Sequence, residues 1–454
     1  MPVAAITGFS IDTRTLQSGD VFVALKDQRD GHDFVAAALA KGAAAALVRD
    51  DYQRQGAGAL IRVDDPLRAL ERIGVAARAR LAPVARVVAI TGSAGKTGTT
   101  AMLKACLAAT GGGIHAPEKS YNNHWGVPLT LARMPADTHY AVFEIGMNHA
   151  GEIRPLVKMV RPHIAVITNV LPVHVGNFAD GERGVARAKA EIIEGVEPHG
   201  SLLLPEDNPH SALLYAVARE HGILAFGFGE GATASVHATS FQLDPDGTTV
   251  MAAFEIEESE MTSWRLGAPG LHLAQNSVAV AGVLALLGVP LWEGLLPLRE
   301  FQSAAGRGAR LELPTPAGPM LLIDESYNAN PASVAAALSA MATVGRDRFP
   351  RRIAVLGDML ELGPQAADFH TGLKPAVDAS GANLVFCCGP NMKRLYESLP
   401  PERRGQWGPA SNDIVAPVAQ ALQAGDVVMV KGSLGSRMAP IVAAIKKRFA
   451  PEHG

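Results

Sequence analysis

The segment of this chain with the clearest chemistry runs from Val87 to Thr100 and reads VVAITGSAGKTGTT. An apolar, β-branched strand breaks into glycines and then reaches Gly95, Lys96 and Thr97 before a helix-like stretch. Glycines let backbone N–H groups approach phosphate oxygens, a lysine brings a mobile cation to the outer phosphates, and a threonine hydroxyl can bind Mg²⁺. The pattern therefore predicts a short phosphate-binding loop, G-x-x-G-K-T, for a nucleoside triphosphate.

Three further polar residues lie at the end of a predicted strand, after one, or within a predicted helix. Glu144 lies at the end of the strand predicted over 140–145, His174 follows the strand predicted over 164–168, and Lys189 lies in the helical pattern AKAEI. In a doubly wound sheet ligands bind at the carboxyl ends of the strands, so we expect Glu144 to face the phosphate loop and to hold Mg²⁺. Each residue also has a non-catalytic interpretation: a solvated glutamate, a loop histidine or a lysine that reaches solvent.

Length and composition set the class of protein. A chain of 454 residues is too long for one hydrophobic core and predicts about three domains. Its net charge of −3 argues against nucleic-acid and membrane-surface binding, both of which need a basic face. The 3 cysteines indicate a reducing compartment, the N-terminus resembles no secretory signal, and the apolar run 278–292 is too short to span a bilayer. We expect a cytoplasmic protein without membrane insertion or a nucleic-acid partner.

The alternation of strand and helix patterns divides the chain into three predicted α/β domains, 1–83, 84–310 and 311–454. The first is a small α/β unit. The second is a doubly wound, mononucleotide-binding sheet that carries the short phosphate loop and a β-rich insertion between Ser235 and Leu266, and the third is Rossmann-like. Strands are predicted at 21–25, 59–63, 87–91, 140–145, 164–168, 202–204, 223–226, 320–323, 353–356, 384–388 and 427–430.

Several further motifs appear in a fixed order along the chain. They are YNNHWGVP at 121–128, EIGMNH at 144–149, GRG at 306–308, IDESYNANP at 323–331, LGDMLELG at 356–363 and VKGS at 430–433. Together with the phosphate loop, His174 and AKAEI, they resemble the Mur ligases of peptidoglycan synthesis. The C-terminal motifs resemble the branch of that family that adds D-alanyl-D-alanine to UDP-N-acetylmuramoyl-tripeptide. The resemblance covers nearly the whole chain.

The resemblance implies an ATP-dependent acid–D-amino-acid ligase that forms a carbon–nitrogen bond through an acyl phosphate and releases ADP and phosphate. The N-terminal domain would bind the UDP substrate, the central domain ATP with two Mg²⁺ ions, and the C-terminal domain the dipeptide while completing the ATP site. The reaction would be the final cytoplasmic step of peptidoglycan precursor synthesis, and so would serve cell-wall formation, cell shape and cell division. The enzyme would act as a monomer on a peptide whose third residue is lysine or diaminopimelate.

The resemblance also implies roles for individual residues. The catalytic set is Lys96, His174, Lys189 and Arg307, and the metal set is Thr97, Glu144, His174 and, if it carries a carbamate, Lys189. Nucleotide contacts are implied for Gly92, Ser93, Ala94, Gly95, Lys96, Thr97, Gly98, Asn276, Arg307 and Asp324. Substrate contacts are implied for Thr13, Lys26, Gly31, His32, Asn122, Asn123, Tyr327, Asn328 and Asn330.

Three other functions stay open at this point. A diaminopimelate- or lysine-adding ligase shares the fold, but its C-terminal D-N-P-R motif is absent and the one Asp-Asn-Pro, at 207–209, lies in the central segment. Folylpolyglutamate synthase shares the ATP machinery but lacks such a first domain. A nucleotide-dependent switch lacks ligase chemistry, but the guanine-reading N-K-x-D motif is missing here.

Overall fold

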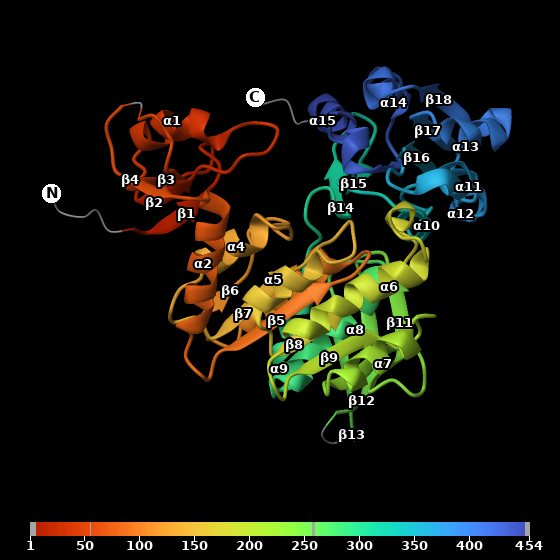
Figure 1. Ribbon diagram of the computed structural model, residues 1–454. Coiled ribbons are helices and arrows are strands. Elements are labelled where there is room, and N and C mark those ends of the chain that lie inside the picture. Colours follow the sequence, from red (N-terminus) through yellow and green to blue (C-terminus); the bar gives the residue numbers. More distant parts are fainter. Residues whose placement is uncertain (1–5, 55, 257–258, 450–454) are drawn as a thin grey trace.

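The computed structural model describes residues 6–54, 56–256 and 259–449 of the chain, and in them three β-sheets follow one another (Figure 1). The sheets lie within residues 8–63, 86–266 and 309–431. Parallel pairing dominates each sheet, and helices flank all three, which confirms the predicted α/β class. None of the helices described is long and apolar enough to cross a membrane.

The N-terminal sheet has four parallel strands in the order β1 (Gly8–Ser10), β2 (Asp20–Val23), β3 (Ala45–Arg49) and β4 (Leu60–Val63). The strands β2 and β3 are apolar and buried, as expected for parallel strands that are covered on both faces. Helix α1 (Val35–Ala40) covers one face. The other face packs against α2 and α4, so part of its core comes from later in the chain.

Helix α2 (Pro66–Ala79) connects the N-terminal sheet to the central one. It begins where the Asp65 carboxylate accepts hydrogen bonds from the N–H groups of Leu67 and Arg68, at 2.8 and 3.2 Å. Pro66 follows at the first helical position, where its missing N–H is no loss. The helix then packs along α4 (Gly126–Ala132) of the central part, as Figure 1 shows.

Arg78 fixes the far end of α2. Its guanidinium is buried and donates hydrogen bonds to the carbonyls of Val160 and Arg161, at 2.8 and 2.7 Å, and it lies 3.4 Å from a Glu197 carboxylate oxygen. A buried cation is stable only when its donors are satisfied. This contact therefore depends on α2 lying against the end of helix α5 (Ile153–Val160).

The central sheet has nine strands in the order β13-β12-β11-β10-β9-β8-β5-β7-β6. The parallel part comprises β5 (Arg86–Thr91), β6 (Ile114–His115), β7 (Tyr140–Glu144), β8 (Ile164–Ile167), β9 (Ser201–Pro205) and β10 (Leu224–Gly229). Strands β11 (Val236–Asp244), β12 (Gly247–Glu255) and β13 (Ser259–Leu266) follow, antiparallel to one another.

The predicted β-rich segment between Ser235 and Leu266 does form strands, namely β11, β12 and β13. Because β11 pairs in parallel with β10, these strands extend the central sheet. The alternating pattern arises because β12 buries alternate side chains against helix α8 (Leu271–Leu286) and exposes the others.

Helices cover both faces of the central sheet. One face packs against α3 (Lys96–Ala108) and α8. The opposite face packs against α4, α5, α6 (Glu182–Ala190) and α7 (Ser211–Glu220). Helix α9 (Leu291–Gly294) follows α8 before the chain enters the third sheet. This two-sided cover leaves the edge at the carboxyl ends of the strands available for ligands.

The C-terminal sheet has six strands in the order β14-β15-β19-β16-β17-β18, and all pairs are parallel except β14 with β15. Its strands are β14 (Ala309–Leu313), β15 (Met320–Glu325), β16 (Arg351–Gly357), β17 (Leu384–Cys388), β18 (Arg404–Gly408) and β19 (Asp426–Lys431). Its helices are α10 (Pro331–Ala342), α11 (Ala366–Thr371), α12 (Lys374–Ser380), α13 (Met392–Ser398), α14 (Val415–Ala421) and α15 (Ala439–Arg448). The two hydrophobic clusters of this sheet contain residues of the C-terminal part alone.

Replacing Arg78 tests the anchor of α2. We expect Arg78→Ala to lower the free energy of unfolding by about 3 kcal/mol, because the change leaves the buried Val160 carbonyl and the partly buried Arg161 carbonyl without a donor. Arg72→Ala on the same helix is the control: its side chain is exposed and its nearest carboxylate oxygen is 3.9 Å away, so the effect should stay within about 0.5 kcal/mol. Urea denaturation measures both values. Equal effects of the two changes would contradict this role of Arg78.

Candidate active site

A cavity of about 900 Å³ lies where loops of the central and C-terminal sheets face each other. The central sheet contributes the loops that follow β5, β7 and β8, together with the start of α8. The C-terminal sheet contributes the loops that follow β15, β16 and β19. Both sets lie at carboxyl strand ends, which is where doubly wound sheets bind ligands.

The loop between β5 and α3 forms the floor of the cavity. Gly95 has a φ of +82°, and a Cβ on it would lie 2.6 Å from the Asn276 side-chain oxygen, so this position requires glycine. The Asn169 side chain accepts a hydrogen bond from the Ala94 N–H at 2.9 Å, and the Thr168 hydroxyl donates to the Ala94 carbonyl at 2.6 Å. Helix α3 starts directly after this loop, so its N-terminal N–H groups face the cavity, where they favour an anion.

Lys96 is folded back onto its own loop. Its Nζ donates to the Gly92 carbonyl at 2.7 Å. Burial lowers the pKa of Lys96, the nearby Glu144 opposes that shift, and the positive charge of Arg307 adds to it. A bound anion would stabilise the charged form of this lysine.

A chain of hydrogen bonds connects the loop to the C-terminal part. The Thr97 hydroxyl donates to Glu144 at 2.8 Å, and the Asn122 amide donates to the other oxygen of that buried carboxylate at 2.7 Å. The Thr97 hydroxyl also lies 3.2 Å from the Ser120 hydroxyl, which accepts a hydrogen bond from Arg307 at 2.7 Å. A hydroxyl, a carboxylate and a guanidinium thus meet beside the phosphate loop.

His174 and Lys189 are the least satisfied polar side chains near this site. His174 has a φ of +60°, and its Nδ1 lies 2.7 Å from a Glu361 oxygen of the C-terminal part, but the two groups are not aligned for a hydrogen bond. Burial lowers the pKa of His174, which Glu361 opposes. The Lys189 side chain is only 3% exposed and has no hydrogen-bond or ion-pair partner within the described residues. Burial, reinforced by the charge of Lys96, places the pKa of Lys189 well below its ordinary value.

Most residues predicted for nucleotide and metal binding line this cavity. They are Ser93, Ala94, Gly95, Lys96, Thr97, Gly98, Glu144, His174, Asn276 and Arg307, whereas Gly92 does not line it. Asn122, predicted as a substrate contact, also lines the cavity. Lys189 does not line the cavity, but it lies close enough to Lys96 and His174 to interact with them electrostatically. Asp324 does not line the cavity: its carboxylate accepts hydrogen bonds from the N–H and hydroxyl of Ser326, and Glu325 is the acid that faces the cavity.

The three predicted dipeptide contacts also line the cavity. Tyr327 is partly exposed, and the Arg307 guanidinium lies 4.0 Å from its ring centroid. The Asn328 side chain accepts a hydrogen bond from the Ala329 N–H, and the Asn330 side chain accepts one from Ser333 as the N-cap of α10. The side-chain oxygens of both asparagines therefore already accept hydrogen bonds from nearby backbone N–H groups.

The residues predicted for UDP binding belong to the N-terminal sheet and do not line this cavity. The Gly31 N–H donates to the Leu25 carbonyl at 2.7 Å, so it is occupied. His32 is buried, with one ring nitrogen 2.6 Å from Asp30 and the other accepting from the Arg49 N–H. The remaining three predicted substrate residues outside the cavity are Thr13, Lys26 and Asn123, and the last caps α4.

Ser120, His272, Glu325, Glu361 and Lys431 are among the cavity residues that were given no role by the sequence. Lys431 is buried and its Nζ donates to Glu325 and to the Asn328 carbonyl, both at 3.0 Å. Glu325 and Lys431 are the last residues of the neighbouring strands β15 and β19, and this register was the signal that could have found them. No comparable signal marks Ser120. Glu361 lies in the motif LGDMLELG, but its contact with His174 depends on how the loops meet.

Comparison with known proteins agrees with this architecture. The Mur ligase middle domain matches residues 90–284, and the domain described as "Mur ligase, glutamate ligase domain" matches residues 309–434. The UDP-N-acetylmuramoyl-tripeptide–D-alanyl-D-alanine ligase of Bacillus subtilis is 31% identical, over 96% of this chain and 92% of that protein. A crystal structure of MurF from Acinetobacter baumannii superposes with a TM-score of 0.82 at 28% identity, over 97% of this chain and 94% of that one.

A more distant structure shares the same fold. MurF ligase from Thermotoga maritima in complex with ADP is 22% identical and superposes with a TM-score of 0.79, over 99% of both chains. The matches to the middle and C-terminal domains, and the similarity to a curated relative along almost the whole length, lead to one assignment. This chain belongs to the Mur ligase family.

Proposed function

We propose that this chain joins D-alanyl-D-alanine to UDP-N-acetylmuramoyl-tripeptide with ATP as the energy source. One observation carries the proposal: a single cavity brings a phosphate loop, a buried carboxylate with its hydroxyl partner, and the loops of a second α/β sheet together. A ligase needs that arrangement, because it must hold a nucleotide, a carboxylate and an amine at one place. The relatives that match along the full chain carry the name of this ligase.

The reaction begins with transfer of the γ-phosphoryl group. A carboxylate oxygen of the tripeptide attacks the γ-phosphorus, the bond to the bridging oxygen breaks, and ADP leaves, which gives an acyl phosphate. Both reactants are anions, so positive charge must lie between them. Lys96, the N-terminus of α3 and Arg307 provide that charge at the edge of the cavity.

The second step forms the amide. The amine of D-alanyl-D-alanine, once it has lost a proton, attacks the carbonyl carbon of the acyl phosphate. The tetrahedral intermediate then loses phosphate as its carbon–oxygen bond breaks. Tyr327, Asn328 and Asn330 lie on the loop that we assign to the dipeptide, while Thr13, Lys26, Gly31 and His32 of the N-terminal sheet are assigned to the UDP moiety.

We assign two Mg²⁺ ions to the cavity and to the residues beside it. The oxygen atoms of Thr97 and Glu144, 2.8 Å apart at the start of α3, are the donor type that Mg²⁺ prefers, and His174 and Lys189 form the second group. Among the described residues no cluster of three His, Cys, Asp or Glu side chains suits a metal, so the second group depends on Lys189. Bound Mg²⁺ would neutralise phosphate charge.

Lys189 suits this role as a carbamate. Burial and the charge of Lys96 lower the pKa of Lys189, which favours its neutral amine, the form that captures CO₂. The product would be an anion with oxygen donors, which the charge of Lys96 would stabilise. With these assignments the protein acts in the cytoplasm, as a monomer, in the supply of precursors for the cell wall.

Phosphate release from ATP tests the reaction directly. The assay combines ATP and Mg²⁺ with UDP-N-acetylmuramoyl-tripeptide bearing lysine or diaminopimelate, and with D-alanyl-D-alanine. We expect release only when both the peptide and the dipeptide are present, and none with glutamate or with folates. Release with UDP-N-acetylmuramoyl-dipeptide and free diaminopimelate would instead assign the chain to the preceding ligase, and chelation of Mg²⁺ should stop the reaction.

Lys96→Ala should remove nearly all turnover and leave the fold intact. We expect a loss of about 100- to 1000-fold in kcat, as when one charged stabilising donor is removed from a transition state. Lys104→Ala, an exposed lysine on the same helix, is the matched control and should keep wild-type activity. A folded Lys96→Ala protein with near-normal phosphate release would exclude the phosphate loop from the mechanism.

Lys189→Ala should be inactive and regain part of its activity with formate or acetate, because a small carboxylate can occupy the position of the carbamate. Lys158→Ala is the control, since that lysine is exposed and its nearest carboxylate oxygen, on Glu194, lies 3.6 Å away. Steady-state phosphate release with increasing acid concentration measures the rescue. An active Lys189→Ala protein without added acid would show that no carbamate is needed.

A further inference from the structure

Two exposed leucines face the cavity from the C-terminal sheet. Leu360 is 42% exposed and follows β16, while Leu434 is 64% exposed and follows β19. Both line the cavity. Apolar side chains form no hydrogen bond or ion pair with phosphate, but they can contact an apolar group of another ligand.

Hydrogen bonds join the two loops that carry these leucines. The Leu360 N–H donates to the Ser433 hydroxyl at 2.9 Å, and the Ser433 N–H donates to the Asp358 carbonyl at 3.1 Å. A Cβ on Gly435 would lie 2.6 Å from a methyl carbon of Leu360, so Leu360 packs directly against the backbone that follows Leu434. The two side chains therefore belong to one surface.

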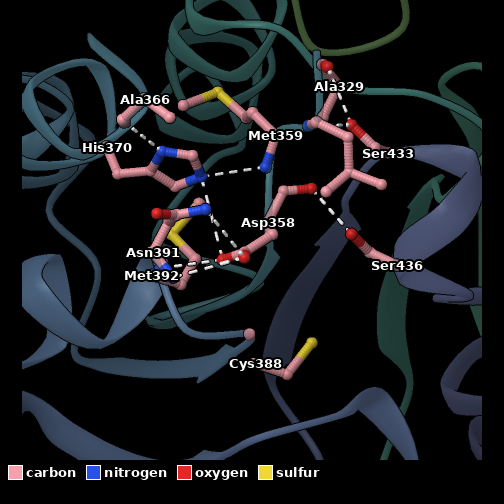
Figure 2. Close-up of polar contacts among 12 residues, drawn as sticks. Ala329, Asp358, Met359, Ala366, His370, Cys388, Asn391, Met392, Ser433 and Ser436 are labelled. Atoms are coloured by element: carbon pink, nitrogen blue, oxygen red, sulfur yellow. Dashed lines mark hydrogen bonds and ion pairs between the residues drawn. The ribbon is translucent and has the colours of Figure 1, made fainter. Parts of the chain in front are cut away.

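Buried polar contacts hold these two loops in place (Figure 2). The Asp358 carboxylate accepts hydrogen bonds from the N–H groups of Asn391 and Met392, at 3.2 and 2.8 Å. Nε2 of the fully buried His370 accepts from the Met359 N–H at 2.9 Å, and the Ser436 hydroxyl donates to the Asp358 carbonyl at 2.7 Å. The backbone that carries the leucines is thus held in place before any ligand binds, which lowers the entropy cost of using them.

The contacts of adjacent residues place the leucines at the end of the cavity that holds the phosphate loop. Glu361, the residue after Leu360, contacts His174 at 2.7 Å. A second apolar lining, made by Phe228, Phe241, Leu273 and Val278, comes from β10, β11 and α8 of the central part. That lining is available to a nucleobase, so the two leucines are left for a different group.

We propose that Leu360 and Leu434 form an apolar wall that contacts the methyl groups of the incoming dipeptide and so favours alanyl over glycyl residues. This inference rests on the proposed function. Of the three substrates, the dipeptide is the small one with two methyl groups, and it must reach the phosphate end from the C-terminal loops. Each buried methyl group gains favourable transfer free energy, and a hydrophobic site discriminates against one missing carbon by about tenfold or more.

Steady-state kinetics with a dipeptide series test the wall. The series is D-alanyl-D-alanine, glycyl-D-alanine and D-alanyl-glycine, each of the last two lacking one methyl group. We expect Leu360→Ala and Leu434→Ala to lower kcat/KM for D-alanyl-D-alanine about tenfold, with smaller losses for at least one glycine dipeptide. The preference for D-alanyl-D-alanine should therefore shrink, while KM for ATP and for UDP-N-acetylmuramoyl-tripeptide stays unchanged.

Matched controls come from leucines of similar exposure outside the cavity. Leu243→Ala and Leu296→Ala, at 40% and 61% exposed, should leave all of these constants at wild-type values. Equal losses of kcat/KM for every dipeptide, or a raised KM for ATP or for the UDP substrate, would overturn the proposed apolar wall but not the proposed function. If the wild-type protein releases no phosphate in response to dipeptide, the proposed function and the wall are overturned together.

Discussion

Parallel strand pairing is the constraint on which the rest of this structure depends. It places each loop that follows a strand at one edge of its sheet, so residues far apart in sequence meet without any direct signal between them. In the central sheet this edge collects Lys96, Glu144 and His174, and in the C-terminal sheet it collects Glu325 and Lys431. The cavity exists because the two edges face each other.

Electrostatics explain why that edge is ready for anions. Lys96 lies near Glu144 and Arg307, Lys189 lies near Lys96, and both lysines have lowered pKa values. The positive charges of Lys96 and Arg307 repel each other, and burial of Lys96 adds to the cost. An anionic ligand relieves both effects, so part of the stability lost in building the site returns as binding free energy.

Much of the fold and part of the site could be predicted from the sequence. Long apolar strands such as β5, β8 and β19 were found because burial on both faces gives continuous apolar runs. Strands β1, β6 and β18 were missed because they are short or carry polar and glycine residues, and β3 because its alanines fit a helix as well.

Some site residues could likewise be predicted from local sequence, and others could not. The phosphate loop and Glu144 are local signals, set by residue type at a strand end. The distinction between Asp324 and Glu325 is not: Asp324 turns toward Ser326, so the acid that faces the cavity is the next residue. The contacts of Arg307 with Ser120, and of Glu361 with His174, join different sheets and follow only from the packing of the two parts.

The packing of α2 has a consequence for substrate size. Residues of the N-terminal sheet, α2 and α4 share one hydrophobic cluster, and Arg78 binds the backbone at the end of α5, whereas the clusters of the C-terminal sheet include no residue of the central part. The N-terminal sheet is therefore joined to the central part by packed and hydrogen-bonded elements. With the nucleotide end of the substrate on that sheet, as we propose, the distance from the sheet to Lys96 sets the length of peptide that can reach the phosphate loop.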